Sequence, residues 1–160
     1  MESDQVNRWL TLGANIGVLT GIILLVVELD QNREMIRAQS RSDISRHISD
    51  HLALIGSNSQ LTSLMRRAEA GEELSADEEA QQFYLFTSNK RMWENIHYQY
   101  RLGIFEEQEF EAERTAWRFL INKDKSFGRN WCLTRENYSP EFVAELESLL
   151  IEDVCIDNAN

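Results

Sequence analysis

The stretch WLTLGANIGVLTGIILLVV, from Trp9 to Val27, contains nineteen residues and no charged side chain. Arg8 precedes this stretch and Glu28 follows it. As an α-helix with a rise of about 1.5 Å per residue it would be about 28 Å long, close to the hydrocarbon thickness of a bilayer. The composition therefore predicts one transmembrane helix, preceded by a short polar extracytoplasmic tail over residues 1–8.

Two other classes of segment have a similar composition. A secretory signal peptide has a basic start and a small-residue cleavage site, whereas this chain starts MESD and continues after the apolar stretch as ELDQN. A helix buried in a soluble protein usually carries a polar stripe, and here the only polar side chains are Thr11, Asn15 and Thr20. These features favour the transmembrane helix over residues 9–27, with the buried helix as the main alternative.

Three glycines, Gly13, Gly17 and Gly21, recur at four-residue intervals within the apolar stretch. This spacing places them on one helix face, where a second membrane helix can approach closely. The opposite face carries a hydroxyl and an amide beside two β-branched residues: Thr11, Asn15, Val18 and Ile22. An amide within a membrane is costly unless it has a hydrogen-bonding partner. We therefore predict a homo-oligomer that associates through the glycine face, with a second interface or a lumen at the polar face.

Basic residues are distributed unequally on the two sides of the apolar stretch. Within twenty residues, the N-terminal side has only Arg8 and the C-terminal side has four arginines: Arg33, Arg37, Arg41 and Arg46. Because basic flanks stay in the cytoplasm, the C-terminal side is predicted to be cytoplasmic. Cys132 and Cys155 have no metal-ligand spacing and are expected there as reduced thiols.

The part of the chain beyond the apolar stretch is acidic. Residues 28–160 contain 15 basic and 25 acidic side chains, a net charge of −10. Nucleic-acid-binding domains are usually basic, so no nucleic acid is expected as a partner. The expected partners are further copies of the chain, membrane lipid and an unidentified cytoplasmic protein.

The sequence after the apolar stretch predicts an all-α protein. No glycine or proline occurs between residues 28 and 55, where apolar residues recur with a helical period: Leu29, Ile36, Ile44, Ile48, Leu52 and Ile55. This pattern predicts an amphipathic juxtamembrane stalk that continues the membrane helix. Residues 56–160 are then predicted to form a cytoplasmic helical domain.

Local signals divide the domain into helices. A short helix over residues 60–70 is expected to stop at Gly71, and Ser75-Ala-Asp-Glu78 is a capping-box signature for a helix that runs to about Leu102. A further helix is expected over 106–122, with Trp117 buried against Trp93. Residues 126–137 look less regular, and Phe127, Trp131 and Leu133 are expected to be buried there. Ser139-Pro140 predicts the start of a last helix that carries five apolar residues: Phe142, Leu146, Leu149, Leu150 and Val154.

Three stretches resemble a family of bacterial membrane-anchored proteins of unknown function. They are VELDQNREMIRAQ (27–39), WENIHYQYRLGIFEEQEF (93–110), and a tryptophan with SPEF (139–142) downstream. The resemblance implies a single-pass anchor in a bacterial inner membrane and a helical cytoplasmic domain. It implies no catalytic residue.

The candidates for site chemistry are few. Glu94-x-x-His97 has the spacing of one arm of a di-iron carboxylate site, but this chain has no second copy of the motif, so only a second subunit of a homodimer could supply the other arm. His47 and His51 are spaced to share a metal, but no third ligand is indicated. The run of aromatic residues from Trp93 onwards is more typical of a core than of a stacking site. We therefore expect no metal, no cofactor and no catalytic residue.

Three classes of function agree with these features. The first is a non-enzymatic, homo-oligomeric scaffold, sensor or adaptor at the membrane. The second is a small channel in which the Thr11 and Asn15 face lines the lumen. The third is a membrane-anchored enzyme with a site near Glu94 and His97.

Overall fold

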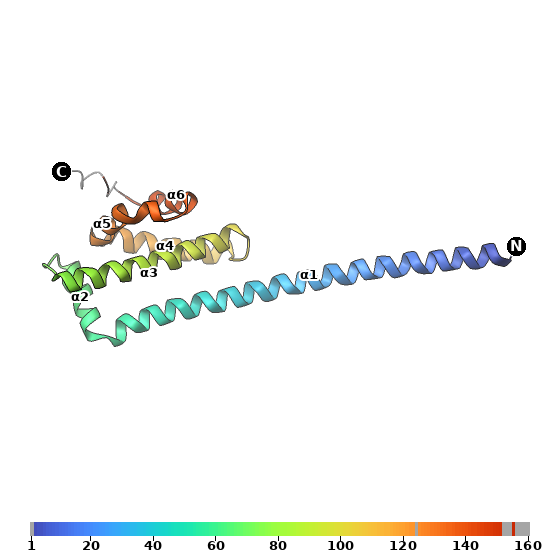
Figure 1. Ribbon diagram of the computed structural model, residues 1–160, viewed down its shortest axis with the longest axis horizontal. Coiled ribbons are helices and arrows are strands. Elements are labelled where there is room, and N and C mark those ends of the chain that lie inside the picture. Colours follow the sequence, from blue (N-terminus) through green and yellow to red (C-terminus); the bar gives the residue numbers. More distant parts are fainter. Residues whose placement is uncertain (1, 124, 152–154, 156–160) are drawn as a thin grey trace. The chain divides into compact units, whose positions relative to one another are not determined.

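The structure is a computed structural model that describes residues 2–123, 125–151 and 155. All of its elements are helical, and the described residues include no strand, which confirms the all-α prediction (Figure 1). In chain order they are α1 (Glu2–Ser57), α2 (Ser59–Glu69), α3 (Ala76–Arg101), α4 (Glu107–Lys123), α5 (Lys125–Thr134), the 3₁₀ turn η1 (Arg135–Asn137) and α6 (Pro140–Ser148).

The chain divides into two compact units, residues 1–39 and residues 40–160. Helix α1 contributes to both units, since the division falls within it. The division also lies inside the stretch 28–55 that the sequence predicts as a stalk. The stalk and the apolar stretch belong to one continuous helix, as the absence of glycine and proline predicts.

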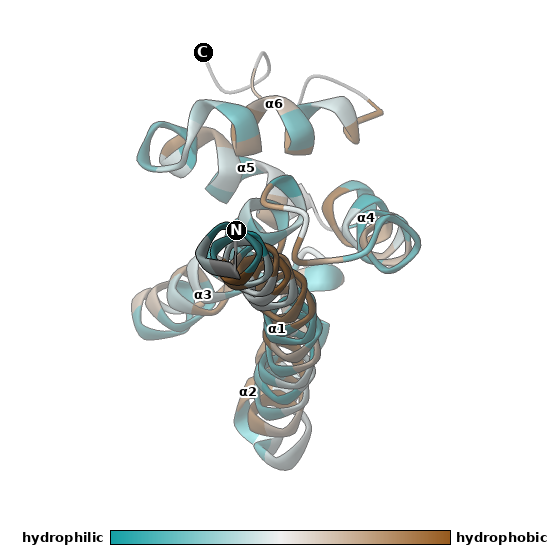
Figure 2. Ribbon diagram, turned by 90° about the vertical axis from the view of Figure 1, so that its right-hand side faces the viewer, coloured by the Kyte–Doolittle hydropathy of each residue, from teal (hydrophilic) through white to brown (hydrophobic). Residues whose placement is uncertain are grey.

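The first unit is the N-terminal part of α1, and the large apolar side chains of its apolar stretch are exposed. Hydrophobic residues colour much of this helix brown (Figure 2). It is the one helix, among the described residues, that is long and apolar enough to cross a membrane. The hydroxyls of Thr11 and Thr20 donate to the carbonyl oxygens of Asn7 and Ile16, each at 2.9 Å. These bonds satisfy the two hydroxyls within their own helix, which makes them compatible with an apolar surrounding.

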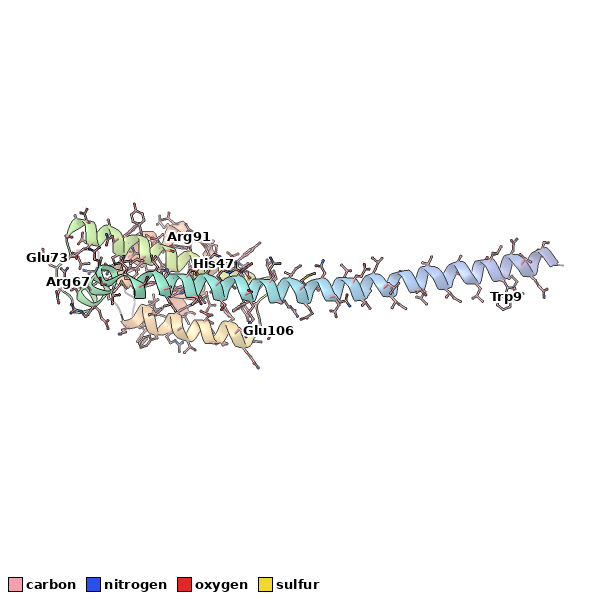
Figure 3. The ribbon with its side chains drawn as sticks, turned by 90° about the horizontal axis from the view of Figure 1, so that it is seen from below. Trp9, His47, Arg67, Glu73, Arg91 and Glu106 are labelled. Atoms are coloured by element: carbon pink, nitrogen blue, oxygen red, sulfur yellow. A yellow bond between two sulfur atoms is a disulfide. The ribbon has the colours of Figure 1, made fainter. Side chains whose placement is uncertain are left out.

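The turn between α2 and α3 follows its sequence signals closely. Gly71 has φ +74°, a left-handed conformation that ends α2 and favours glycine. The Ser75 hydroxyl and the Glu78 side chain form the predicted capping box at the start of α3. Arg67 holds this turn together (Figure 3), since its guanidinium donates to the Glu78 carboxylate at 2.6 Å and to the Glu73 carbonyl at 2.8 Å.

The core of the second unit is a cluster of aromatic side chains between α3, α4, α5 and α6. Trp93 of α3 and Trp117 of α4 are buried and stacked, with ring centroids 5.3 Å apart, which confirms their predicted burial. Phe110 and Phe142 meet the Trp117 ring edge-on, at 5.6 and 6.3 Å. The last part of α1 also packs on this core, because Ile44 is buried in the cluster.

Three local expectations need correction. The stretch expected to be less regular contains helix α5. Phe127 and Trp131 of this helix are buried, which confirms the expectation for them, whereas Leu133, also expected to be buried, is 81% exposed. The last helix is shorter than expected, since α6 ends at Ser148 and Leu149 only caps it. Val154, expected on that helix, lies outside the described residues.

The state of the cysteines also differs from the expectation. The sequence predicts reduced thiols, whereas the structure joins Cys132 and Cys155 in a disulfide. This bond ties the segment after α6 to helix α5, at a sequence separation of 23 residues.

Candidate functional site

The Glu94-x-x-His97 motif, singled out for metal chemistry, has a structural role. The Glu94 carboxylate accepts a bond from the Ser139 backbone N–H at 2.8 Å and one from Arg91 at 2.7 Å. Burial raises the pKa of Glu94, but these donors outweigh burial and the net pKa lies below its usual value. Glu94 is therefore an ionised anchor for the start of α6.

His97 is buried between two aromatic rings rather than directed at a metal position. The ring centroids of Phe110 and Phe142 each lie 5.9 Å from its imidazole. Burial lowers the pKa of His97, so the neutral imidazole is favoured. Among the described residues, no group of three or more His, Cys, Asp or Glu side chains could hold a metal ion.

His47 and His51 lie on successive turns of α1 but in different surroundings. His47 is exposed (Figure 3), whereas His51 is half-buried and lines a cavity. Burial lowers the pKa of His51, which favours its neutral form. The two imidazoles, which the sequence spacing would allow to share a metal, therefore lie in different environments.

The cavity beside His51 is the candidate functional site. It has a volume of about 370 Å³ and lies between the last turns of α1, the middle of α3 and the second half of α4. Its walls are mainly apolar, and Ile48, Leu52, Trp93 and Trp117 are among them. Cavities of this volume, apolar with a few polar groups, are typical small-molecule sites.

Three polar side chains reach this cavity: His51 from α1, Asn89 from α3 and Glu113 from α4. Burial raises the pKa of Glu113. The Trp117 indole N–H, one turn further along α4, partly opposes that rise, although its geometry falls short of a hydrogen bond. Glu113 is the only acidic side chain on the cavity wall, which carries no lysine or arginine among the described residues.

A second polar feature, Lys90, is fully buried in the core beside the cavity-lining residues of α3. Its ammonium group donates to the Asn130 side chain and to the Thr134 hydroxyl, the latter at 2.6 Å. The Phe127, Trp131 and Tyr138 rings surround it, with centroids 5.5–5.7 Å from Nζ. Burial, with a smaller effect of the neighbouring Arg91, lowers the pKa of Lys90 to about 8.

The lowered pKa of Lys90 predicts a domain that becomes more stable as the pH rises. Between the folded pKa of about 8 and the ordinary value of 10.5, the unfolded chain binds the proton more tightly, so raising the pH favours folding. We expect the free energy of unfolding to increase by about 2 kcal/mol from pH 7.5 to 9.5. Tyr138 faces the same cluster and stays protonated in this window, since burial raises its pKa above 10.

Urea unfolding of the full chain at the two pH values measures this effect. Lys90→Met is the matched variant, because it keeps the aliphatic stem and removes the titrating amine. Its stability should change little between the two pH values. An equal increase in both proteins would show that Lys90 is not the titrating group.

Sequence reasoning missed both the cavity and Lys90. Lysines are rarely buried, so a lysine in the sequence is expected at the surface. No local spacing distinguishes Lys90 from an exposed lysine. Glu113 and His51 are separated by 62 residues in the chain, so only the packing of α1 against α3 and α4 brings them to one cavity.

Comparison of the chain with protein-family models, with characterised proteins and with solved structures finds no match. The site is therefore interpreted from its own geometry and chemistry.

Proposed function

We propose that the chain is a non-enzymatic, single-pass membrane protein that self-associates and acts as a sensor or adaptor through its helical domain. The observation that carries this proposal is the course of α1. This one helix contains the exposed apolar stretch 9–27 and, at its other end, the cavity residues Ile48, His51 and Leu52. The first unit thus supplies a segment suited to a membrane, and the second unit supplies a cavity suited to a ligand.

The geometry around Glu94 and His97 favours this proposal over an enzyme. Both side chains are engaged in packing, Glu94 with the start of α6 and His97 with two phenylalanines. Neither side chain lines the cavity. A channel lined by Thr11 and Asn15 is the alternative function, and the internal hydrogen bond of Thr11 leaves Asn15 as the group that would face its lumen.

The proposed orientation places the domain in the cytoplasm of a bacterium. The four arginines after the apolar stretch support this side of the membrane. The disulfide between Cys132 and Cys155 is then the oxidised form of a pair that the cytoplasm keeps reduced.

Self-association through the glycine face is tested by Gly17→Leu. Outside the adjacent backbone of its own helix, a Cβ added at Gly13, Gly17 or Gly21 meets no atom within 4 Å, so a side chain at these positions has open space in the single chain. We expect Gly17→Leu to reduce the oligomer mass strongly, because the larger side chain separates the two helices and removes their close contacts. Leu19→Ile, away from the glycine face, is the control and should leave the mass unchanged.

The measurement is the particle mass in mild detergent, made on the full chain and on a shortened chain that ends near Asp30. The shortened chain removes any contact through the second unit. A monomeric shortened chain, or equal masses for it and its Gly17→Leu variant, would exclude the glycine face as the interface.

A further inference from the structure

The cavity between α1, α3 and α4 has walls of a distinct chemical kind. Four aromatic side chains line it: Phe86, Trp93, Trp117 and Phe127. Aliphatic side chains and methionines from α1, α2, α3 and α4 also line it, and some remain accessible, with Leu52 at 62% and Leu120 at 42% exposure. The cavity is therefore open to a ligand from solution.

The charge of the cavity wall is set by one carboxyl group. Glu113 forms none of the ion pairs found among the described residues, although most acidic residues near it on α4 do. Glu109 pairs with Arg41 at 2.9 Å, and Glu111 pairs with Arg114 at 2.7 Å. Glu113 is thus a half-buried carboxyl group without a cation, in a wall that offers none.

We propose that this cavity binds a hydrophobic monocation, with the positive charge beside Glu113 and the apolar body against the aromatic wall. A cation supplies the missing counter-charge, and in an apolar surrounding this pairing is stronger than in water. Aromatic faces also attract cations. The net charge of −10 over residues 28–160 raises the local concentration of cations further.

Other ligand classes fit the same wall less well. A fatty acid or another apolar anion would place its charge beside Glu113, with no lysine or arginine on the wall to compensate. A neutral apolar ligand would displace water from Glu113 without offering it a partner. The core of the same domain also encloses a cation in this way, since the Lys90 ammonium lies among Phe127, Trp131 and Tyr138.

The test uses two probes of the same shape and opposite charge, tetraphenylphosphonium and tetraphenylborate. Equilibrium dialysis measures their binding to the full chain in mild detergent, against protein-free micelles at the same detergent concentration. We expect saturable binding of the phosphonium that is at least about ten-fold tighter than in Glu113→Gln, a difference of about 1.4 kcal/mol. Tetraphenylborate should bind no more weakly to Glu113→Gln than to the unmodified chain.

Two further variants make the result specific. Glu107→Gln removes the same charge from an exposed position at the start of α4 and should leave phosphonium binding unchanged. Ala116→Trp fills the cavity from its rim and should abolish saturable binding of the phosphonium. Circular dichroism of each variant establishes that it folds before its binding is compared.

The proposal is overturned by equal phosphonium affinity in the unmodified chain and Glu113→Gln, by equal affinity for the two probes, or by the absence of saturable binding. This inference rests on the proposed function in one respect: the hydrophobic monocation would be the ligand that the sensor domain detects. Binding is measured independently of oligomer mass, so its failure and a failure of self-association are distinguishable.

Discussion

Replacing Trp117 by alanine is expected to lower the free energy of unfolding of the domain by about 3–5 kcal/mol. Trp117 is fully buried, with its ring stacked on Trp93 at 5.3 Å. The substitution removes the largest side chain of α4 from the centre of the core and leaves a void that its rigid neighbours cannot fill. The aromatic contacts with Trp93, Phe110 and Phe142 are lost as well, which adds to the cost of the lost buried area.

Phe119→Ala is the matched control for Trp117→Ala. Phe119 is an aromatic residue on the same helix, but it is 61% exposed and its only ring contact in the described residues is with Lys123. Urea unfolding of the full chain in mild detergent, followed by circular dichroism, measures both variants. Similar stability losses for the two variants would contradict the central position of Trp117.

The helices that local signals define were predictable from the sequence. Ser75 and Glu78 form a capping box because each side chain accepts a hydrogen bond from the backbone N–H of the other residue, three positions away. Gly71 and Gly103 end their helices because a left-handed residue is needed there, and both have positive φ. Such signals involve neighbouring residues only, so they do not depend on the rest of the fold.

Helix α5 was not predictable because its stability comes from its neighbours. It has ten residues and contains Gly128, which weakens an isolated helix by about 1 kcal/mol. Burial of Phe127 and Trp131 against α3 and α6 compensates for that weakness. Short helices are marginally stable in water without such packing. The sequence pattern of a short segment is therefore weak evidence that it forms a helix.

The burial of two residues in the wall of the candidate site was predictable, but the site itself was not. The sequence gives Trp93 and Trp117 a buried helical face, and the structure confirms that burial. It also marks Glu94 and His97, whose spacing suggests a metal site, although the fold uses both in packing. The cavity depends instead on Glu113 and His51, which no motif connects and which meet only through the tertiary packing.

Reduction of the bond between Cys132 and Cys155 is expected to lower the free energy of unfolding by about 3 kcal/mol. The bond closes a loop of 23 residues, and a closed loop restricts the unfolded chain by about this amount in the loop-entropy model. Within that loop lies α6, whose Phe142 and Leu146 are buried in the core. The bond therefore favours the folded position of α6 by making its unfolded alternatives fewer.

Urea unfolding of the full chain with and without a reductant measures this effect. The double variant Cys132→Ser, Cys155→Ser is the control, since its stability should resemble that of the reduced chain and should not respond to the reductant. If the reductant leaves the unmodified chain equally stable, the bond does not constrain the folded domain.

The same pair of cysteines reports on the side of the membrane that the domain occupies. A cytoplasmic domain keeps both thiols reduced, so a maleimide polymer added to cells at the moment of lysis should label Cys132 and Cys155 without prior reduction. Four arginines after the apolar stretch support this outcome. Labelling that requires a reductant would show that the bond forms in the cell. It would favour an oxidising compartment for the domain and contradict the proposed orientation, because disulfides form and persist in such compartments and are rare in the cytoplasm.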